Sequence, residues 1–533
     1  MRRWLPSRST FTAAAMTAVL LFVAYAPYSL VVPSFLALVP FLWLLEERVS
    51  GSADVSPSGG GGSLAPGDAA GLGRADGAAK VGFWAGLLAN GLILYWMVVA
   101  LWHFTPLAAA GYLATILVLG AWWALLGWTT VWVRRRTRIP LWVVFPLLWT
   151  AVEWGIGHQG DIRFPWLGLG TSLTTVPVLV QWAEIAGARG VTLWLAWANV
   201  MVYLTLRYRR WRPAAALLLT LAAALGYGVW RERSLVLKPA TVVAVVQPNV
   251  GFKEKLAERD RDRQVERLLR LTVRADSLPG VRLVAWPEAA VDGYFVDHPQ
   301  WVQWIGDTAR ALRVPILAGG LDARFYPNGT YDVYNAAFYF DTTGSDTGYR
   351  PYHKTYLVPI VERVPFLPPR WFGKLKWFGG FGRGEHFPLY PVAAHAGLPG
   401  GRFGVLICYE SAFEDLARRY RREGADFLLN ITNDAWFGRT AAPYQHASHL
   451  VMRAIETRMG IARAANTGIS EFVDPLGRTH LRTALDTRGV EADTVYTTAG
   501  LTPYVRWGDW VGLLALVGSG ALVVAVLIRR TGR

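Results

Sequence analysis

The sequence predicts a multi-span α-helical membrane domain joined to an α/β domain. Hydrophobic residues make up 53% of the 533 residues and charged residues only 17%, which is more apolar than an average soluble protein. Apolar runs of membrane-spanning length occur before residue 231 and after residue 507. The region between them alternates apolar, β-branched runs with amphipathic segments, a pattern typical of sheets covered by helices.

Eight apolar runs approach or exceed the length that crosses a bilayer. They lie at about 10–28, 30–45, 82–102, 107–133, 139–157, 189–207, 213–230 and 508–528. We therefore expect a membrane domain over 1–230 with about seven spans, and one C-terminal span at 508–528. The Gly-, Ser- and Ala-rich segment 50–79 is expected to be a flexible cytoplasmic linker.

The basic residues predict the orientation of these spans. Much of the formal net charge of +16 flanks apolar runs, which argues against a nucleic-acid partner. With eight spans, the Arg clusters beside the spans all fall on one side, which the positive-inside rule assigns to the cytoplasm. These clusters are Arg2 and Arg3; Arg134, Arg135 and Arg136; Arg207, Arg209, Arg210 and Arg212; and Arg529, Arg530 and Arg533. The region 231–507 is then expected on the outer face.

Hydrophobic periodicity predicts the elements of the α/β domain. Strands are expected at 241–246, 281–286, 314–318, 333–341, 403–407 and 427–431. Helices are expected at 262–275, 298–313, 410–423 and 443–459. Polar and reactive residues collect where several of these strands end, and in open α/β sheets that edge is where sites lie.

Three residues at such strand ends could form a nucleophilic site. Glu288 could take the proton of the Cys408 thiol, while the Lys354 ammonium stabilises the thiolate and a later oxyanion. Each residue also has a structural interpretation. Cys408 could be a small buried hydrophobe, Glu288 a cap at a strand end, and Lys354 a solvated loop residue.

Other candidate groups are weaker. Cys408 is the only cysteine, so no intramolecular disulfide can form. His446 and His449 have a spacing that could bind metal, but no acidic or Cys partner is close in sequence, so we expect no metal and no cofactor. Cys408 with His446 could also resemble a Cys–His protease pair. Glu153, at the end of the fifth predicted span, is either functional or a structural hydrogen-bond acceptor.

An aromatic and basic segment over 364–382 suits contact with the headgroup layer of a membrane. Its Pro and Gly content excludes a long helix or strand. The alternative is a loop folded onto the core of its own domain. We expect its aromatic side chains, together with Trp436, to form an interfacial arm that meets lipid. The arm residues are Phe366, Trp371, Phe372, Trp377 and Phe378, interleaved with Arg370, Lys374 and Lys376.

Several motifs together resemble the carbon–nitrogen hydrolase (nitrilase) superfamily and, within it, the apolipoprotein N-acyltransferase family. They are Trp286-Pro287-Glu288; His353-Lys354; Leu357-Val358-Pro359 with Glu362 and Val364-Pro365; Ile407-Cys408-Tyr409-Glu410; 430–438; Gln445-His446; 453–456; 463–468; and Phe164-Pro165-Trp166-Leu167. The resemblance covers nearly the whole chain and implies an αββα sandwich for the α/β domain. Val361 stands where the family commonly has Gly, so the turn before Glu362 is expected to differ.

The resemblance also implies the roles of individual residues. Glu288 matches the general base, Lys354 the lysine that stabilises the oxyanion, and Cys408 the nucleophile that carries an acyl chain as a thioester. Glu362 matches an auxiliary glutamate. The remaining auxiliary residues are Tyr409 and Glu410, which flank the nucleophile where backbone N–H groups can complete an oxyanion hole.

The implied reaction is a ping-pong acyl transfer in a bacterial inner membrane. The donor is a phospholipid, typically phosphatidylethanolamine, and the acceptor is the α-amine of the S-diacylglyceryl cysteine of an apolipoprotein. The protein is expected to be a monomer with its catalytic domain on the periplasmic face. Two alternatives remain: a membrane-tethered amidase of the nitrilase type acting on a small amide, and a transporter with an outer receptor domain.

Overall fold

The computed structural model describes residues 5–50, 67–102, 108–251, 254, 261–291, 293–327, 331–343, 351–367, 380–395 and 397–531. It divides into two compact units. The helical unit comprises Met1–Val98, Ala109–Val229 and Asp509–Arg533. The α/β unit comprises Val99–Ala108 and Trp230–Gly508.

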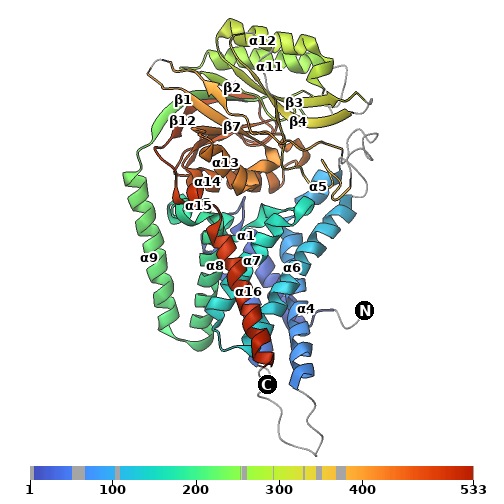
Figure 1. Cartoon of the computed structure of the whole chain (residues 1–533), viewed down its shortest axis with the longest axis vertical. Coiled ribbons are helices and arrows are strands. Elements are labelled where there is room, and N and C mark those ends of the chain that lie inside the picture. Colours follow the sequence, from blue (N-terminus) through green and yellow to red (C-terminus); the bar gives the residue numbers. More distant parts are fainter. Residues whose placement is uncertain are drawn as a thin grey trace, which may run out of the picture. The chain divides into compact units, whose positions relative to one another are not determined.

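Helices form at all eight of the apolar runs (Figure 1). They are α1 (Arg8–Ala24), α2 (Val31–Leu36), α3 (Val39–Ser50), α4 (Gly67–Ile93), α5 (Trp96–Trp102), α6 (Ala108–Arg136), α7 (Leu141–His158), α8 (Ala183–Tyr208), α9 (Trp211–Ser234) and α16 (Trp510–Thr531). The second predicted span is divided into α2 and α3, in a run that holds Pro33 and Pro40.

Four helices within the described part of the chain are long and apolar enough to cross a membrane. They are Ala109–Arg136, Ala183–Tyr208, Trp211–Ser234 and Trp510–Arg529. The pair Gly77–Ile93 and Trp96–Trp102, bent by 58°, makes a fifth if it forms one broken span. The chain is therefore a multi-pass membrane protein, while the count of eight spans stays a prediction.

The structure corrects the predicted linker. Helix α4 begins at Gly67, so the second half of the segment 50–79 is helical. The alanines between 69 and 79 favour a helix, and the segment continues directly into the apolar part of α4. Residues 51–66 lie outside the described residues.

Contacts inside the helical unit distinguish its two ends. At one end, Arg134 in the last turn of α6 forms an ion pair of 3.1 Å with Glu46 of α3, and the Arg207 guanidinium lies over the Trp43 ring. At the other end, the Tyr25 hydroxyl after α1 donates to the Leu167 carbonyl oxygen. The ends of α3, α6 and α8 that carry basic residues thus come together, as the positive-inside pattern requires.

The α/β unit contains two six-stranded sheets. The first has the order β12-β1-β2-β3-β4-β5 and the second the order β11-β10-β9-β8-β7-β6. The strands of the first are β1 (Lys238–Gln247), β2 (Leu283–Ala285), β3 (Ile316–Phe325), β4 (Tyr331–Phe340), β5 (Tyr352–His353) and β12 (Gly489–Thr497). Those of the second are β6 (Tyr390–Val392), β7 (Gly401–Ile407), β8 (Phe427–Thr432), β9 (Gly460–Ala465), β10 (Glu471–Val473) and β11 (Thr479–His480).

Both sheets have the same plan. Three central strands run parallel, β1-β2-β3 in one and β7-β8-β9 in the other, and the outer strands pair antiparallel. Inner faces meet where β1 packs on β9, and the Tyr339 and Phe403 rings lie 5.8 Å apart. The parallel strands therefore end near one another, as a shared site at their carboxyl ends requires.

Helices cover the outer faces of both sheets (Figure 1). They are α11 (Arg261–Asp276) and α12 (Pro299–Leu312) on the first sheet, and α13 (Glu414–Arg422) and α14 (Ala442–Thr457) on the second, with α15 (Pro503–Trp507) beside α13. The predicted α/β fold with helices outside two sheets is confirmed. The helix predicted at 410–423 begins only at Glu414, because residues 408–412 form a 3₁₀ turn.

Gly319 of β3 lies where the fold leaves no room for a side chain. A Cβ there would lie 2.2 Å from the Pro287 carbonyl oxygen and 2.8 Å from the Glu288 Cα. We predict that Gly319→Ala forces β3 and the Glu288 segment apart and destabilises the protein by about 1–3 kcal/mol. The apparent melting temperature of the purified protein in detergent measures this.

Gly306→Ala is the matched control. Gly306 lies in α12 with open space around its Cβ position, so alanine should leave the melting temperature unchanged or raise it. Equal melting temperatures for the Gly319→Ala variant and the wild type would contradict the close approach of β3 to Glu288.

Candidate active site

Glu288 follows β2 and connects the two sheets. Backbone hydrogen bonds from Trp286 to Leu317, 2.8 Å, and from Ala290 to Gly319, 2.9 Å, hold its segment on β3. Its Oε2 accepts a 2.9 Å bond from the backbone N–H of Asn433, which follows β8 of the second sheet. The carboxylate is buried, so it lies at the junction of the two sheets and away from bulk water.

Lys354 follows the short strand β5, and its side chain is 1% exposed. The Nζ atom lies 3.3 Å from Glu288 Oε1 and 2.9 Å from Glu362 Oε1. Burial alone would lower the pKa of Lys354, but the charges of Glu288 and Glu362 raise it well above its usual value. The side chain is therefore a fixed cation at the site.

Asn335 of β4 contacts both carboxylates, a role that was not predicted from the sequence. Its Nδ2 donates to Glu288 Oε1 at 2.7 Å and to Glu362 Oε1 at 3.0 Å. An Asn within the apolar strand predicted at 333–341 is the signal that could have identified it, because Asn is depleted in strands. Asn335 helps to hold two like charges around one ammonium.

Glu362 lies on a tight turn that the sequence predicted to be unusual. Its Oε2 accepts from the Val358 backbone N–H at 2.8 Å, and its own N–H donates to the Val358 carbonyl oxygen. Ile360 in this turn has a φ of 70°, in the left-handed region that β-branched residues rarely adopt. The turn thus holds Glu362 against Lys354 without the glycine that the family commonly has before this glutamate.

Cys408 follows β7 and is brought to the same site. Its φ is 51°, so the chain turns sharply at the end of the strand, and the residue is 9% exposed. Burial raises the pKa of the thiol, as does the Glu288 carboxylate, while Lys354 opposes the increase. The resting state is therefore a thiol beside a carboxylate and an ammonium, which is the arrangement for a general base to activate a nucleophile.

Glu410 is not the start of the next helix, because it lies in the 3₁₀ turn at 408–412. Its carboxylate links this turn (the Cys408 turn) to residues 352–356, the segment that carries Lys354 (the Lys354 loop). Its Oε2 accepts from the Ile407 N–H at 2.7 Å. Its Oε1 accepts from the Thr355 N–H at 2.6 Å, the Tyr356 N–H at 3.2 Å and the Tyr352 hydroxyl at 2.7 Å. Burial raises the pKa of Glu410 to about 7 against these hydrogen bonds.

His446 of α14 does not contact Cys408 as a protease base would. Its Nε2 lies 2.9 Å from the Cys408 backbone carbonyl oxygen, and its Nδ1 lies 2.9 Å from Asp434 Oδ1. The Arg463 guanidinium donates to Asp434 Oδ2 at 2.9 Å. In the part of the chain that the structure describes, no group of three or more His, Cys, Asp or Glu side chains could hold a metal ion.

The other predicted residues differ in their surroundings. Tyr409 is buried, with its ring 5.1 Å from the Phe413 ring. Phe366 is 70% exposed, which suits a residue of an interfacial arm. Trp436 is half-buried in the short 3₁₀ turn Asp434–Trp436. The remaining arm residues, Trp371, Phe372, Trp377 and Phe378, lie outside the described residues.

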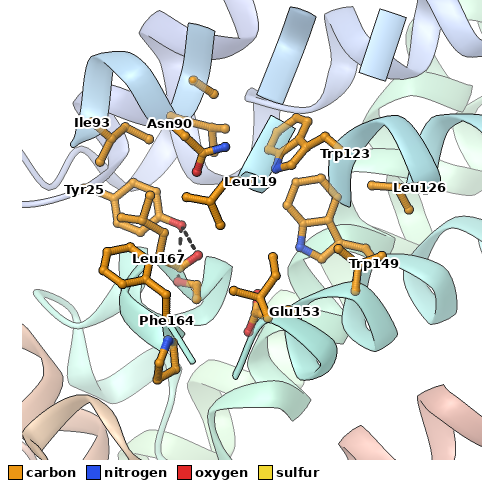
Figure 2. A pocket seen from close by; sticks show the side chains of 16 residues that line it. Tyr25, Asn90, Ile93, Leu119, Trp123, Leu126, Trp149, Glu153, Phe164 and Leu167 are labelled. Carbon is orange, nitrogen blue, oxygen red and sulfur yellow. Dashed lines mark hydrogen bonds between the residues drawn. The ribbon is translucent and has the colours of Figure 1, made fainter. Parts of the chain in front are cut away.

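The helical unit has a largely apolar pocket of its own (Figure 2). Figure 2 shows Trp123 and Trp149 on one side of it, and Tyr25 and Phe164 on the other. Glu153 also lines this pocket. Its carboxylate accepts from the Leu169 N–H at 2.9 Å and the Thr192 hydroxyl at 2.8 Å. These bonds support the structural interpretation of Glu153, because they hold the segment that follows the Phe164-Pro165-Trp166-Leu167 motif.

Two family models match separate parts of the chain. The carbon-nitrogen hydrolase model matches residues 242–498, and the model described as the apolipoprotein N-acyltransferase N-terminal domain matches residues 69–201. Among solved structures, the chain is similar to Saccharomyces cerevisiae Nit3, described as a member of branch 10 of the nitrilase superfamily. That likeness has 19% identity and a TM-score of 0.36, and it covers 51% of this chain and 94% of Nit3.

Relatives of known name match most of the chain. A Geobacter metallireducens protein named apolipoprotein N-acyltransferase is 34% identical, over 85% of this chain and 87% of that protein. Proteins of the same name from Bradyrhizobium diazoefficiens and Brucella melitensis are 31% and 30% identical, each over 87% of this chain and over 88% and 85% of their own lengths. The similarity therefore extends through both units.

We predict that Glu410 makes stability depend on pH. The pKa of Glu410 rises from 4.5 to about 7 on folding, so between these pH values the folded chain keeps a proton that the unfolded chain releases. The stability that this group contributes is complete below pH 4.5 and falls by about 3 kcal/mol as pH rises to 7.

Glu410→Gln should lack this component of the pH dependence. The measurement is the free energy of unfolding of the purified protein from pH 4.5 to 8, for wild type and variant. Glu385→Gln, at an exposed position, is the control and should follow the wild type. Parallel pH profiles for Glu410→Gln and wild type would show that Glu410 does not titrate in this range.

Proposed function

The chain belongs to the apolipoprotein N-acyltransferase family, and we propose on this basis how its own residues carry out acyl transfer. The enzyme is an N-acyltransferase that takes an acyl chain from a lipid and gives it to a lipoprotein. Phosphatidylethanolamine is the donor that we propose, and the acceptor is the α-amine of an S-diacylglyceryl cysteine. The observation that carries the assignment of residues is the buried Lys354 ammonium held between Glu288 and Glu362, beside the only thiol of the chain.

In the first half-reaction, Glu288 accepts the proton of the Cys408 thiol as sulfur attacks the ester carbonyl of the phospholipid. The tetrahedral oxyanion is stabilised by Lys354 and by the Tyr409 backbone N–H. Its collapse breaks the ester C–O bond, and Glu288 returns the proton to the leaving alkoxide. The products are a thioester on Cys408 and a lysophospholipid.

The second half-reaction reverses these roles. The neutral α-amine attacks the thioester carbonyl and transfers its proton to Glu288, and the C–S bond breaks as the amide forms. The proton then returns to the Cys408 sulfur. Burial of Cys408, Glu288 and Lys354 supports this scheme, because water that reached the thioester would hydrolyse it.

The two alternative functions, an amidase and a transporter, are not favoured. An amidase acting on a small amide would need only the α/β domain and one helix to anchor it in the membrane. Residues 69–201 instead match the model of the apolipoprotein N-acyltransferase N-terminal domain. A transporter would not need a buried Glu–Lys–Cys group in its outer domain. We further propose that the protein acts as a monomer in the inner membrane with its α/β unit on the periplasmic face.

We predict that Glu288→Gln abolishes the acyl adduct on Cys408, because the thiol keeps its proton. The purified protein is incubated with phosphatidylethanolamine in detergent micelles and its intact mass is followed. The wild type should gain one fatty acyl group, and Cys408→Ala should gain none. The exposed substitution Glu385→Gln should acylate normally. An adduct in Glu288→Gln at the wild-type rate would disprove the role of the base.

We predict that the α/β unit is accessible from the periplasm. In a Cys408→Ala background, Asp297→Cys and Arg210→Cys place single exposed thiols in the α/β unit and at the basic end of the helical unit. A membrane-impermeant maleimide on spheroplasts should label Asp297→Cys at once and Arg210→Cys only after permeabilisation. The opposite pattern would reverse the proposed topology.

A further inference from the structure

His446 is a buried histidine for which the reaction above has no use. It lies on α14 and is fully buried, with its ring edge-on to the Phe437 ring at 6.2 Å. Its Nε2 faces the Cys408 carbonyl oxygen at 2.9 Å. A carbonyl oxygen can only accept, so Nε2 carries hydrogen and donates.

The other ring nitrogen, Nδ1, lies 2.9 Å from Asp434 Oδ1 and 3.1 Å from an Arg463 nitrogen. A neutral ring with its hydrogen on Nδ1 would leave Nε2 and the Cys408 carbonyl oxygen as two facing acceptors, which is unfavourable. The contact with Cys408 therefore requires hydrogen on Nε2, whether Nδ1 donates to Asp434 or accepts from Arg463.

Asp434 and Arg463 are themselves fixed. Arg463 donates from Nε to the Ile469 carbonyl oxygen at 2.9 Å and from Nη1 to Asn430 Oδ1. The Thr432 hydroxyl donates to Asp434 at 3.1 Å. Burial alone would raise the pKa of Asp434, but Arg463 and His446 lower it below its usual value. Asp434, in the turn after β8, and Arg463 of β9 therefore fix the orientation of the His446 ring.

The bond to Cys408 also fixes the next N–H group. The Cys408–Tyr409 peptide is trans, so its C=O and N–H point in opposite directions. Because His446 holds the C=O on the side of α14, the Tyr409 N–H is directed away from that side. Cys408 has a left-handed φ of 51°, a conformation that a non-glycine residue keeps only where its surroundings enforce it.

We propose that His446 is a positioning residue that holds the Tyr409 N–H in the orientation needed to donate to the acyl oxyanion. It acts through the Cys408 carbonyl oxygen and touches neither the thiol nor the substrate. This inference rests on the proposed function, since it concerns how the thioester forms.

Two reactions of Cys408 separate this role from a general effect on the thiol or the fold. Acylation by p-nitrophenyl butyrate forms an S–C bond through a tetrahedral oxyanion, with the thiol proton passing to Glu288 and p-nitrophenolate leaving. Alkylation by iodoacetamide is a displacement at a saturated carbon and forms no oxyanion. Both adducts are measured by intact mass on the full chain in detergent.

The test compares His446→Gln with His446→Asn. Gln places an amide N–H near the position of Nε2, whereas Asn is one methylene too short. His446→Asn should lower the acylation rate about 10- to 100-fold. This loss is smaller than the loss expected when an oxyanion donor itself is removed. The alkylation rate of His446→Asn should change less than about threefold, and His446→Gln should recover most of the acylation. If His446→Asn does not fold, His446→Met, which also lacks the donor, replaces it.

His449→Gln, one turn further along α14 and also buried, is the matched control and should acylate at the wild-type rate. The proposal is overturned if His446→Asn acylates normally, if alkylation falls in parallel, or if His446→Gln loses as much as His446→Asn. Phosphatidylethanolamine is tested separately with the wild type. No adduct from this lipid alongside normal acylation by p-nitrophenyl butyrate would count against the proposed donor and leave the test of His446 intact.

Discussion

The Lys354 ammonium is buried away from water, and a buried charge is tolerated only when opposite charges and hydrogen bonds surround it. Glu288 and Glu362 supply two carboxyl groups that contact the ammonium at 3.3 and 2.9 Å. Asn335 and the Asn433 N–H hold the carboxylates in place. These partners come from β2, β4, a tight turn and the second sheet. The constraint of compensating one cation therefore determines how the two sheets must be aligned.

The nucleophile is held by a different set of hydrogen bonds. Glu410 ties the turn after β7 to the Lys354 loop through three N–H groups and one hydroxyl. His446 holds the Cys408 carbonyl oxygen from α14. Cys408 is thus fixed in a left-handed conformation by its surroundings rather than by its own preference.

Much of the fold followed from local patterns in the sequence. Long apolar runs predicted the helices of the membrane unit, and all six of the predicted strands form. The strands β5, β6 and β9–β12 were missed, because several have only two or three residues and others, such as β9 with its Arg463, interrupt the apolar pattern. The first turns of α4 were not predicted, because the Gly- and Ser-rich composition of the residues before Gly67 indicates a linker. Short strands are stabilised by their neighbours in the sheet, so their own residues predict them poorly.

The sequence by itself determined which residues are chemically capable of the reaction: one thiol, and a carboxylate and an amine at strand ends. It also determined where apolar segments could cross a membrane. The tertiary structure alone decided which groups meet, because the pairs that matter are far apart in the chain. Glu288 and Asn335 are separated by 47 residues, Glu288 and Asn433 by 145, and Cys408 and His446 by 38. Hydrogen bonds depend on distance and direction, and no local pattern of residues records either.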